Sequence, residues 1–487
     1  MELLLGIDLG TTGCRSILYD RQLSTLGEDY TEYPLINLSE RMIEQDAEQW
    51  WQLTLQSIRG ALEKSGSDKN DLRGISVSSQ GIAFVPVDAS GHPLANAISW
   101  LDSRAAEEAA GIAQIFPPER LFHMTGKRAN EMYVLPKLLW LKKHQPELYE
   151  KTYKFLMAHD YIVNRLCGAF VTDHTLASGT ILYDIHRQDW SKELLSAFDI
   201  DRKRLPDIIW SGTVAGTLKK DIAGLLGLRE DVAVAAGGQD QKCAALGAGI
   251  EDGIVTISLG TACAIERNYE EPFIDAQMRI PCFSGLFKNK WVAEGVVNTA
   301  AVTLRWLRDT LFPQSSYDEL SGMAGSGLDS PGTLFFYPHL AGGGSPDWYS
   351  GAMGTYYGIR LNTRAEDFAA ALFEGIAFQI KSNILVMSQT DANIREIRVF
   401  GGGAKSAVWC QVIADITGYP VKVPFTAETA CAGAAIFAGI GSGAYQDADD
   451  ARRYISIAKT YLPDEKRRAA YESKYTEYIR IEKRLWE

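Results

Sequence analysis

The chain has 487 residues, of which 46% are hydrophobic and 23% charged, and its formal net charge at pH 7 is −12. A chain of this length can form two or three domains with full hydrophobic cores, and this composition excludes a wholly disordered protein. The acidic balance argues against a general nucleic-acid-binding protein, which needs a basic face to displace counterions from phosphates.

The seven cysteines form no CxxC pair and their number is odd. This usage favours small core residues in a reducing compartment over a disulfide set or a zinc site. The apolar start of the chain is too short for a signal peptide, and no run reaches the roughly 18 apolar residues of a membrane span. We therefore expect a cytoplasmic protein that neither enters a membrane nor binds nucleic acid.

The hydrophobic spacing predicts alternating helices and strands along the whole chain. In chain order it predicts a helix over 47–63, strands over 72–78 and 82–87, a helix over 135–143, a strand over 232–236, a helix over 241–249, a strand over 394–400, and helices over 406–417, 432–440 and 464–487. No low-complexity linker separates these elements, so we expect an α/β fold throughout.

A short segment near the N-terminus returns at about half the length of the chain. Ile7-Asp-Leu-Gly-Thr-Thr12 reappears as Ile257-Ser-Leu-Gly-Thr-Ala262, and apolar runs flank both copies. Each copy predicts a strand, a tight glycine turn and a second strand. The alternative is a chance match of a short motif. A true duplication predicts two related domains, 1–248 and 249–487, which face each other across a cleft between the turns at Gly10 and Gly260.

The first copy combines glycines, threonine hydroxyls and one carboxylate in a single turn. Glycine lets backbone N–H groups approach phosphate oxygens, and threonine hydroxyls add donors. Asp8 stands at the end of the predicted strand, where a carboxylate could hold hydrated Mg²⁺. The alternative is a hairpin turn with Asp8 as a turn former. Ser258 replaces Asp8 in the second copy, which suits one metal ion held mainly from one side.

Asp240 lies between a predicted strand and a predicted helix, within Gly237-Gly-Gln-Asp-Gln241. One interpretation is a helix N-cap, for which Asp is favoured. The other is a general base for a substrate hydroxyl. Because a carboxyl pKa of about 3.9 lies far below that of an alcohol, Asp240 could not form an alkoxide in advance. It could accept the proton late, during phosphoryl transfer through a loose transition state.

Two further segments could contact ligands. Gly401-Gly-Gly-Ala-Lys-Ser406 follows a predicted strand, and three consecutive glycines exceed what a tight turn needs, which favours contact with a nucleotide. Gln80-Gly81 and the run from Trp100 to Arg104 offer amide, carboxylate and guanidinium groups beside an indole, a set that suits a polyhydroxylated ligand. The alternative is a core Trp100 with a surface ion pair between Asp102 and Arg104.

The order of these motifs resembles the FGGY family of carbohydrate kinases, which has the actin/hexokinase superfold. GIDLGTTG and ISLGTA resemble the two phosphate loops of the family, GGQDQ resembles its catalytic segment, and GGGAKSAVWCQVIADITG resembles its adenosine segment. AGAAIFAGIG and PKLLWL are also similar to family segments, so the resemblance covers nearly the whole chain. Within the family, EQDAEQWW (44–51), PKLLW and GGGAKS are most similar to xylulokinases.

The resemblance implies two ribonuclease-H-like domains that close over ATP and a small sugar. The sugar that the resemblance implies is a ketopentose such as xylulose. It implies that Asp240 is the general base and that Asp8 holds Mg²⁺ through water. The residues implied to bind ATP are Gly10, Thr11, Thr12, Arg15, Gly260, Thr261, Arg305, Gly402, Gly403 and Ser406. The residues implied to line the sugar pocket are Gln80, Gly81, Trp100, Asp102, Arg104 and Gln241.

Two departures from the family pattern leave the sugar open. Xylulokinases usually carry Gly-Glu-Arg-Thr/Ser-Pro where this chain has Gly342-Gly-Gly-Ser-Pro346, and often His-Gly where it has Gln80-Gly81. Kinases for L-ketoses can show Gln-Gly at the second position, so another ketose or a polyol is an alternative substrate. A non-enzymatic nucleotide switch on the same fold is the alternative from another class. The apolar stripe of the last helix could pack on its own domain or form a homodimer.

Overall fold

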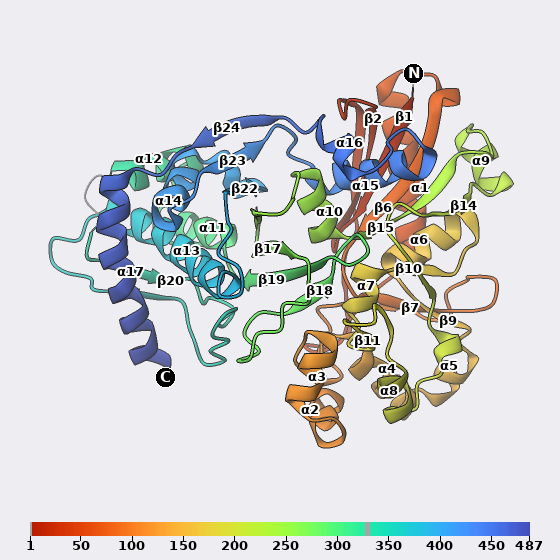
Figure 1. Cartoon of the computed structure of the whole chain (residues 1–487), viewed down its shortest axis with the longest axis horizontal. Coiled ribbons are helices and arrows are strands. Elements are labelled where there is room, and N and C mark those ends of the chain that lie inside the picture. Colours follow the sequence, from red (N-terminus) through yellow and green to blue (C-terminus); the bar gives the residue numbers. More distant parts are fainter. Residues whose placement is uncertain (1, 327–331) are drawn as a thin grey trace.

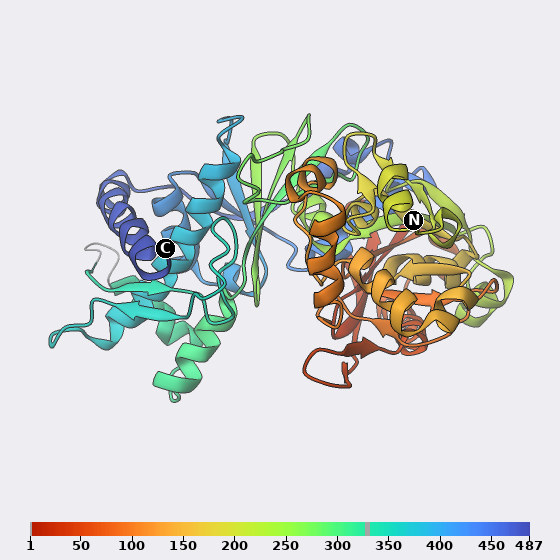
Figure 2. The ribbon, with the colours of Figure 1, turned by 90° about the horizontal axis from the view of Figure 1, so that it is seen from below.

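The computed structural model describes residues 2–326 and 332–487. The chain forms two lobes that lie side by side, and Figure 2 shows the same pair from below. The N-terminal lobe is built on a six-stranded sheet of order β14-β15-β6-β1-β2-β3, and the C-terminal lobe on a seven-stranded sheet of order β18-β19-β17-β16-β22-β23-β24.

The central strands of the N-terminal lobe are β1 (Leu3–Leu9), β2 (Gly13–Asp20), β3 (Thr25–Glu32), β6 (Leu72–Ser79), β14 (Val214–Thr217) and β15 (Ala233–Gln239). A five-stranded sheet adds β4 (Ile36–Asn37), β5 (Ile43–Gln45), β7 (Phe84–Val87), β8 (Ala97–Ile98) and β9 (Lys154–Met157). Two short pairs are β10 (Val171–Asp173) with β13 (Asp207–Ile209), and β11 (Tyr183–Asp184) with β12 (Asp189–Trp190). The helices are α1 (Ala47–Ser65), α2 (Ala106–Ile115), α3 (Pro118–Thr125), α4 (Val134–His144), α5 (Pro146–Lys151), α6 (Ala158–Cys167), α7 (His174–Ser178), α8 (Lys192–Ala197), α9 (Lys220–Leu226) and α10 (Asp240–Gly247).

The central strands of the C-terminal lobe are β16 (Ile254–Leu259), β17 (Cys263–Tyr269), β18 (Cys282–Ser284), β19 (Trp291–Val297), β22 (Glu396–Phe400), β23 (Val421–Pro424) and β24 (Ile457–Tyr461). A hairpin joins β20 (Phe335–Tyr337) to β21 (Thr355–Tyr357). The helices are α11 (Ala301–Leu311), α12 (Tyr317–Ser326), α13 (Ala365–Met387), α14 (Ala407–Thr417), α15 (Thr429–Ser442), α16 (Ala448–Arg452) and α17 (Glu465–Trp486).

The two sheets repeat one topology. β1 is antiparallel to β2 and parallel to β6, while β16 is antiparallel to β17 and parallel to β22. In the N-terminal sheet, β3 pairs with β2 in antiparallel and β15 pairs with β6 in parallel. In the C-terminal sheet, β19 pairs with β17 in antiparallel and β23 pairs with β22 in parallel. The mixed α/β fold in two domains, expected from the sequence, is confirmed, and the two glycine turns occupy equivalent places in the two sheets.

Helix α15 belongs to the second half of the chain but packs on the N-terminal sheet, where Figure 1 shows it beside β1 and β6. Small residues make this close packing possible. A Cβ on Gly6 would lie 2.0 Å from the Cys431 carbonyl oxygen, and one on Gly74 would lie 2.4 Å from the Ala438 carbonyl oxygen. The predicted domain boundary near residue 249 assigns α15 to the C-terminal domain, although this helix packs on the N-terminal sheet. The boundary therefore stays a prediction.

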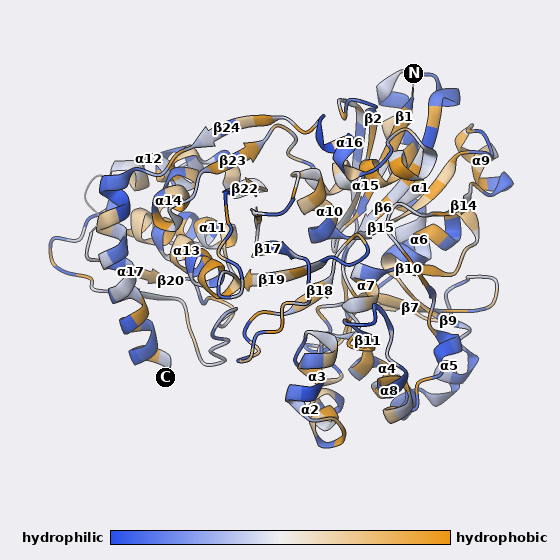
Figure 3. Cartoon of the chain, viewed as in Figure 1, coloured by the Kyte–Doolittle hydropathy of each residue, from blue (hydrophilic) through white to orange (hydrophobic). Residues whose placement is uncertain are grey.

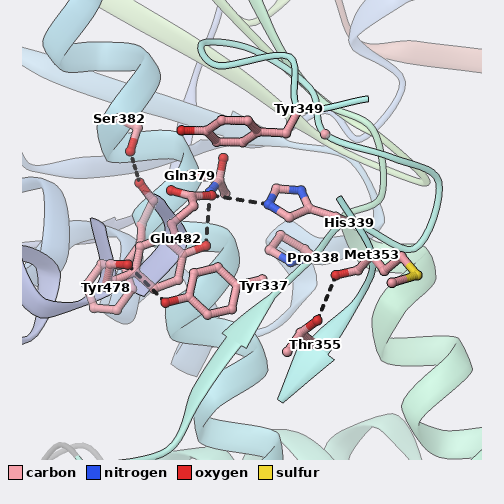
Figure 4. A network of polar contacts seen from close by, with 12 residues as sticks. Tyr337, Pro338, His339, Tyr349, Met353, Thr355, Gln379, Ser382, Tyr478 and Glu482 are labelled. Atoms are coloured by element: carbon pink, nitrogen blue, oxygen red, sulfur yellow. Dashed lines mark hydrogen bonds and ion pairs between the residues drawn. The ribbon is translucent and has the colours of Figure 1, made fainter. Parts of the chain in front are cut away.

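Helix α13 forms the centre of the C-terminal lobe. By length and composition it could cross a membrane, but most of it is buried among the other elements of this lobe, and Figure 3 shows its hydrophobic residues there. The last helix, α17, covers α13 through a buried polar network shown in Figure 4. Gln379 donates to Glu482 over 2.6 Å, and His339 Nε2 lies 3.1 Å from the same carboxylate. Three residues of the apolar stripe of the tail, Tyr471, Tyr478 and Ile481, are buried in the core of this lobe, so this part of the stripe packs on its own domain.

Candidate active site

Asp8 lies one residue before the end of β1, at the start of the first glycine turn. The turn is closed by a hydrogen bond of 2.9 Å from the Gly10 N–H to the Gly13 carbonyl oxygen. Asp8 Oδ1 accepts a hydrogen bond of 2.8 Å from the Ser78 hydroxyl. Burial, and after it the charge of Glu428, raises the pKa of Asp8 to about 6, although Ser78 and Arg15 act in the opposite direction.

Asp240 is the first residue of α10, and Gln239 is the residue that precedes the helix as its N-cap. The interpretation of Asp240 as the N-cap is therefore wrong. Asp240 Oδ1 accepts two hydrogen bonds of 2.7 Å, from the Gln241 backbone N–H and from Gln239 Nε2. Burial raises the pKa of Asp240 to about 7, and the nearby charge of Asp8 adds to this rise. A carboxyl group with this pKa is matched to proton transfer near neutral pH.

The sheet topology brings these two carboxyl groups together. β15, β6 and β1 are adjacent and parallel, so their carboxyl ends meet at the same edge of the sheet. Asp8 is opposite Ser78, and Gln239 is opposite Ser79, on the two sides of β6. The effect of the Asp8 charge on the pKa of Asp240 follows from this arrangement.

The threonines of the first turn are held by side chains from other elements. Trp100 Nε1 donates to Thr11 Oγ1 over 2.9 Å, and Gln45 Nε2 donates to the Thr11 carbonyl oxygen over 2.8 Å. The Thr12 carbonyl oxygen accepts a hydrogen bond of 2.9 Å from the Tyr33 N–H. The Trp100 indole N–H thus contacts the first glycine turn, and contact of Trp100 with a sugar stays a prediction.

Arg15, expected to contact phosphates, forms ion pairs in this structure. Its Nε lies 3.2 Å from Glu428, which immediately precedes α15, and its Nη1 lies 3.7 Å from Glu28. The guanidinium also lies over the Tyr30 ring, 4.8 Å from its centre. Glu28 is largely exposed and Glu428 partly so. Such ion pairs contribute little to stability, so Arg15 can exchange a carboxylate for a phosphate at low cost.

The second glycine turn, between β16 and β17, lies against the start of α11. The Ala300 N–H donates to the Thr261 carbonyl oxygen and the Ala301 N–H donates to that of Gly260, both over 2.8 Å. These bonds fix the turn at the N-terminus of α11, where backbone N–H groups favour an anion. Arg305 is exposed on the next turn of the same helix.

The three glycines that follow β22 lie against the second turn. Gly401 has φ of 86°, a left-handed conformation that favours glycine. A Cβ on Gly403 would lie 2.5 Å from Leu259 Cγ, so the residue before Gly260 packs on the Gly401–Gly403 segment. Ser406 caps α14, since its hydroxyl accepts a hydrogen bond of 3.2 Å from the Trp409 N–H. Contact of Gly402, Gly403 and Ser406 with adenosine stays a prediction.

A small apolar cluster joins this segment to helix α10, which begins with Asp240. Phe400, the last residue of β22, is buried against Ala244 and Ala248 of α10 and its neighbour, with Ala430 of α15 beside them. The start of the Gly401–Gly403 segment and the helix that begins with Asp240 are therefore in one packed unit.

Three glutamine side chains near Asp240 have buried amide atoms without a hydrogen-bond partner in the part of the chain that the structure describes. Both amide atoms of Gln80 are unpartnered, and so are the amide oxygens of Gln239 and Gln241. Gln80 is 1% exposed. A Cβ on Gly81 would lie 3.2 Å from Gln239 Cγ, which places Gln80-Gly81 beside Gln239. Because buried amides without partners are costly, this group indicates a site for ligand hydroxyls.

Gln239 is a candidate site residue that the sequence interpretation did not include. Its Nε2 donates to Asp240, and its Oε1 is free of partners among the described residues. The sequence could have indicated Gln239 as a site residue through its position, since it is the last residue of the strand that leads to Asp240.

Asp102 and Arg104 form an ion pair, as one alternative expected, but it is buried and not at the surface. Arg104 Nη2 lies 2.9 Å from Asp102 and 2.8 Å from Glu44, and the Arg104 side chain is 3% exposed. The Ile43 N–H also donates to Asp102 over 2.6 Å. These contacts occupy both side chains, and their contact with a sugar stays a prediction.

The loop that contains Gly342-Gly-Gly-Ser-Pro346 runs against β19. A Cβ on Gly344 would lie 2.2 Å from the Val296 carbonyl oxygen, and Asn298 Nδ2 donates to the Gly343 carbonyl oxygen over 3.2 Å. The described backbone thus has no room for the Arg that xylulokinases usually carry at the third position of this run.

A cavity of about 710 Å³ lies elsewhere between the lobes. It is lined by the residues of α10 that follow Asp240, such as Lys242 and Leu246, and by Arg395, Arg398 and Arg452. Asp8, Asp240 and the glycine turns are not among its lining residues. We therefore place the candidate active site at the sheet edge where the carboxyl groups of Asp8 and Asp240 meet, and not in this cavity.

Comparison with known proteins agrees with this geometry. The models for the FGGY family of carbohydrate kinases match residues 3–247 with the N-terminal domain and 255–442 with the C-terminal domain. The chain is 31% identical to xylulose kinase from Bacillus subtilis (strain 168), over 99% of this chain and 97% of the relative. The structures of ligand-bound xylulose kinase and of gluconate kinase from Lactobacillus acidophilus each match with a TM-score of 0.93 and 26% identity. They cover 100% and 99% of this chain, and 98% of each of those chains.

The two family models together match most of the chain, and a 31% identical relative covers nearly its full length. The chain therefore belongs to the FGGY family of carbohydrate kinases and is an ATP-dependent sugar kinase.

Proposed function

We propose that this kinase transfers the terminal phosphoryl group of ATP to a hydroxyl group of xylulose, with Asp240 as the general base. The observation that carries the proposal is the group of unpartnered buried amides of Gln80, Gln239 and Gln241 beside Asp240. Amide groups can both donate to and accept from hydroxyls, which is what a neutral polyhydroxylated substrate needs. The 31% identical xylulose kinase supports this choice of sugar.

Asp240 is arranged to take up a proton. Gln239 and the Gln241 N–H both bind its Oδ1, which leaves Oδ2 to accept the proton of the attacking hydroxyl. The pKa of about 7 makes Asp240 a stronger base than an ordinary carboxylate, while it is still ionised in a large share of molecules at neutral pH. The proton leaves the hydroxyl as its oxygen bonds to phosphorus, and Asp240 holds that proton afterwards.

Asp8 and Asp240 also fit a divalent cation. The two carboxyl groups lie at one sheet edge with raised pKa values, and a nearby positive charge would favour the ionised form of both. Hydrated Mg²⁺ is usually held by one or two carboxylates and by substrate phosphates, and Asp8 is the residue that would hold it here. Mg²⁺ would neutralise charge on the phosphates during transfer.

We assign ATP to the two glycine turns and the segment after β22. Gly10, Thr11, Thr12, Gly260 and Thr261 would contact phosphates through backbone N–H groups and hydroxyls. Arg15 and Arg305 would add positive charge, and Gly402, Gly403 and Ser406 would lie along adenosine. A cytoplasmic location and a homodimer stay predictions.

Gluconate is the second candidate, because a gluconate kinase structure matches as well as a xylulose kinase structure. Its carboxylate would require a cation in the pocket. The Arg104 guanidinium is already enclosed by Asp102 and Glu44. Burial lowers the pKa of Lys137 to about 7, and its ammonium donates to the Ser99 and Met132 carbonyl oxygens. This distribution of charge favours a neutral sugar.

The test is ADP release measured by a coupled assay with D-xylulose, L-xylulose, ribulose, gluconate and glycerol. We expect the highest kcat/KM with a xylulose isomer. A higher kcat/KM with gluconate would select the second candidate. Equal ADP release with and without every sugar would contradict the kinase reaction and favour a nucleotide switch.

A further inference from the structure

The strand that leads to Asp240 contains a bulge. β15 pairs with β6 in parallel, and the register shifts between Ala235 and Gly238, so that β15 has one extra residue there. Gly237 lies in this bulge, where a Cβ would lie 2.0 Å from the Val77 carbonyl oxygen. A bulge interrupts the ladder of hydrogen bonds and re-aims the side chains that follow, and bulges are frequent beside active sites. The backbone N–H groups of β15 then need other partners.

His159 supplies one of these partners. The Gly237 N–H donates to His159 Nε2 over 3.0 Å, and His159 Nδ1 lies 3.0 Å from Asp160 Oδ1. Since Nε2 accepts a hydrogen bond, the ring proton is on Nδ1 and is donated to Asp160. Both side chains are fully buried. The carboxylate therefore fixes the tautomer with which His159 holds the bulge.

Thr175 supplies the second partner. The Gln239 N–H donates to Thr175 Oγ1 over 2.9 Å, and this hydroxyl donates to Asp173 Oδ2 over 2.6 Å. The Thr175 hydroxyl has one proton, which Asp173 takes up, so a lone pair remains for the Gln239 N–H. Thr175 is 1% exposed and Asp173 is fully buried. His159 and Thr175 thus act in the same way: each accepts a hydrogen bond from a backbone N–H next to Gly238, and a buried carboxylate orients each acceptor.

We propose that His159 and Thr175 are positioning residues for phosphoryl transfer, which hold the bulged end of β15 so that Asp240 is aimed at the sugar hydroxyl. The inference rests on the proposed role of Asp240 as the base. Neither residue needs to touch substrate. Gln239 is bonded to Thr175 through its backbone and to Asp240 through its side chain, so a shift of Gln239 moves the base. A misplacement of about 1 Å can cost about 10²-fold in rate.

The first test compares Thr175→Val with Thr175→Ser. Valine has the shape of threonine but offers no acceptor to the Gln239 N–H, whereas serine keeps the hydroxyl. We expect Thr175→Val to lower kcat by about 10- to 100-fold, with the KM for ATP within about twofold of wild type. Thr175→Ser should stay within about threefold. Thr152→Val is the matched control, because Thr152 is also buried but its hydroxyl bonds only to the Leu148 carbonyl oxygen. It should lower stability without lowering kcat.

The second test asks whether Thr175 acts through Asp240. In an Asp240→Asn background, Thr175→Val should cost less than about threefold, because residues that act as a unit are not additive. The same fold loss in both backgrounds would overturn the inference. Wild-type activity of Asp240→Asn alone would instead refute the proposed base, so the two failures are distinct. If Thr175→Val does not fold, Thr175→Cys is tested in the same cycle and compared with Thr175→Ser, because both lack the methyl group and cysteine replaces the hydroxyl by a weak acceptor.

Discussion

Replacing Asp240 with Asn should separate activity from stability. Asn keeps the Oδ1 acceptor for Gln239 and for the Gln241 N–H but cannot take up a proton. General-base assistance contributes about 10²–10⁴-fold, so kcat should fall by that factor, or about 3–5 kcal/mol in the barrier. A coupled assay with xylulose and saturating ATP measures this loss. Activity within about threefold of wild type would rule out Asp240 as the base.

The same variant should be more stable than wild type at alkaline pH. The native pKa of Asp240 is raised from 3.8 to about 7, so between about pH 4 and 7 the native state binds more protons than the unfolded state. Wild-type stability contributed by this group therefore falls as pH rises through that window. At about 1.4 kcal/mol per pKa unit, the ionised carboxylate destabilises the native state above pH 7 by at most about 4 kcal/mol. The actual cost is smaller than this limit, because Asp240 is only half-buried and solvent screens its charge.

We therefore expect Asp240→Asn to raise the free energy of unfolding by about 1–4 kcal/mol at pH 8 and by almost nothing at pH 4, in protein free of Mg²⁺. Urea unfolding at the two pH values measures both quantities. Asp231→Asn is the control, because this exposed carboxylate before β15 pairs only with Arg229 and should change neither activity nor the pH dependence. A difference in stability that is equal at pH 4 and pH 8 would refute the reasoning.

The remaining predictions concern the neighbours of Asp240. Asp8→Asn removes a negative charge that raises the pKa of Asp240, so the ascending limb of the pH profile of kcat/KM should move to lower pH. Its turnover should also fall, while sugar affinity without ATP stays close to wild type; unchanged turnover across a Mg²⁺ titration would contradict this. Gln80→Met removes two unpartnered buried polar atoms, so it should raise the melting temperature and raise the KM for the sugar by about tenfold. An unchanged sugar KM would show that Gln80 lies outside the pocket.

The glycine turns predicted much of the fold because their chemistry is local. The motif of an apolar strand, a Gly-Thr turn and a second strand consists of contiguous residues, so the copies at Gly10 and Gly260 were visible without any structure. Their repetition predicted two similar sheets, and the strand order around β1 and β16 is in fact the same. The course of α15 was not predictable in this way, because Gly6 and Gly74 show their role only when the helix lies on them.

The candidate site shows the same limit. The sequence pointed to Asp240 by its position between strand and helix, but whether Asp240 is the N-cap depends on which residue ends β15, and a shift of one residue decides it. The role of Asp240 as the base stays a prediction. The ion pair of Asp102 and Arg104, which one alternative placed at the surface, is buried and includes Glu44, a residue distant in sequence. Gln239 was missed because the role of a glutamine depends on where its amide points, which its neighbours in sequence do not specify.

At the sheet edge where β1 and β15 end, burial favours the neutral form of Asp240, whereas the proposed role as a base requires the ionised form. An isolated carboxyl group at this depth would remain protonated, and a protonated Asp240 could not act as a base. The hydrogen bond from the Gln241 N–H and the charge of Lys242 limit this cost, because both lower the pKa of Asp240, and the side chain is only half-buried. Its pKa is then close to neutral instead of far above it. The hydrogen bonds from Gly237 to His159 and from Gln239 to Thr175 fix the end of β15 directly before Asp240. A change at Thr175 should therefore alter the aim of Asp240 in its proposed role as the base.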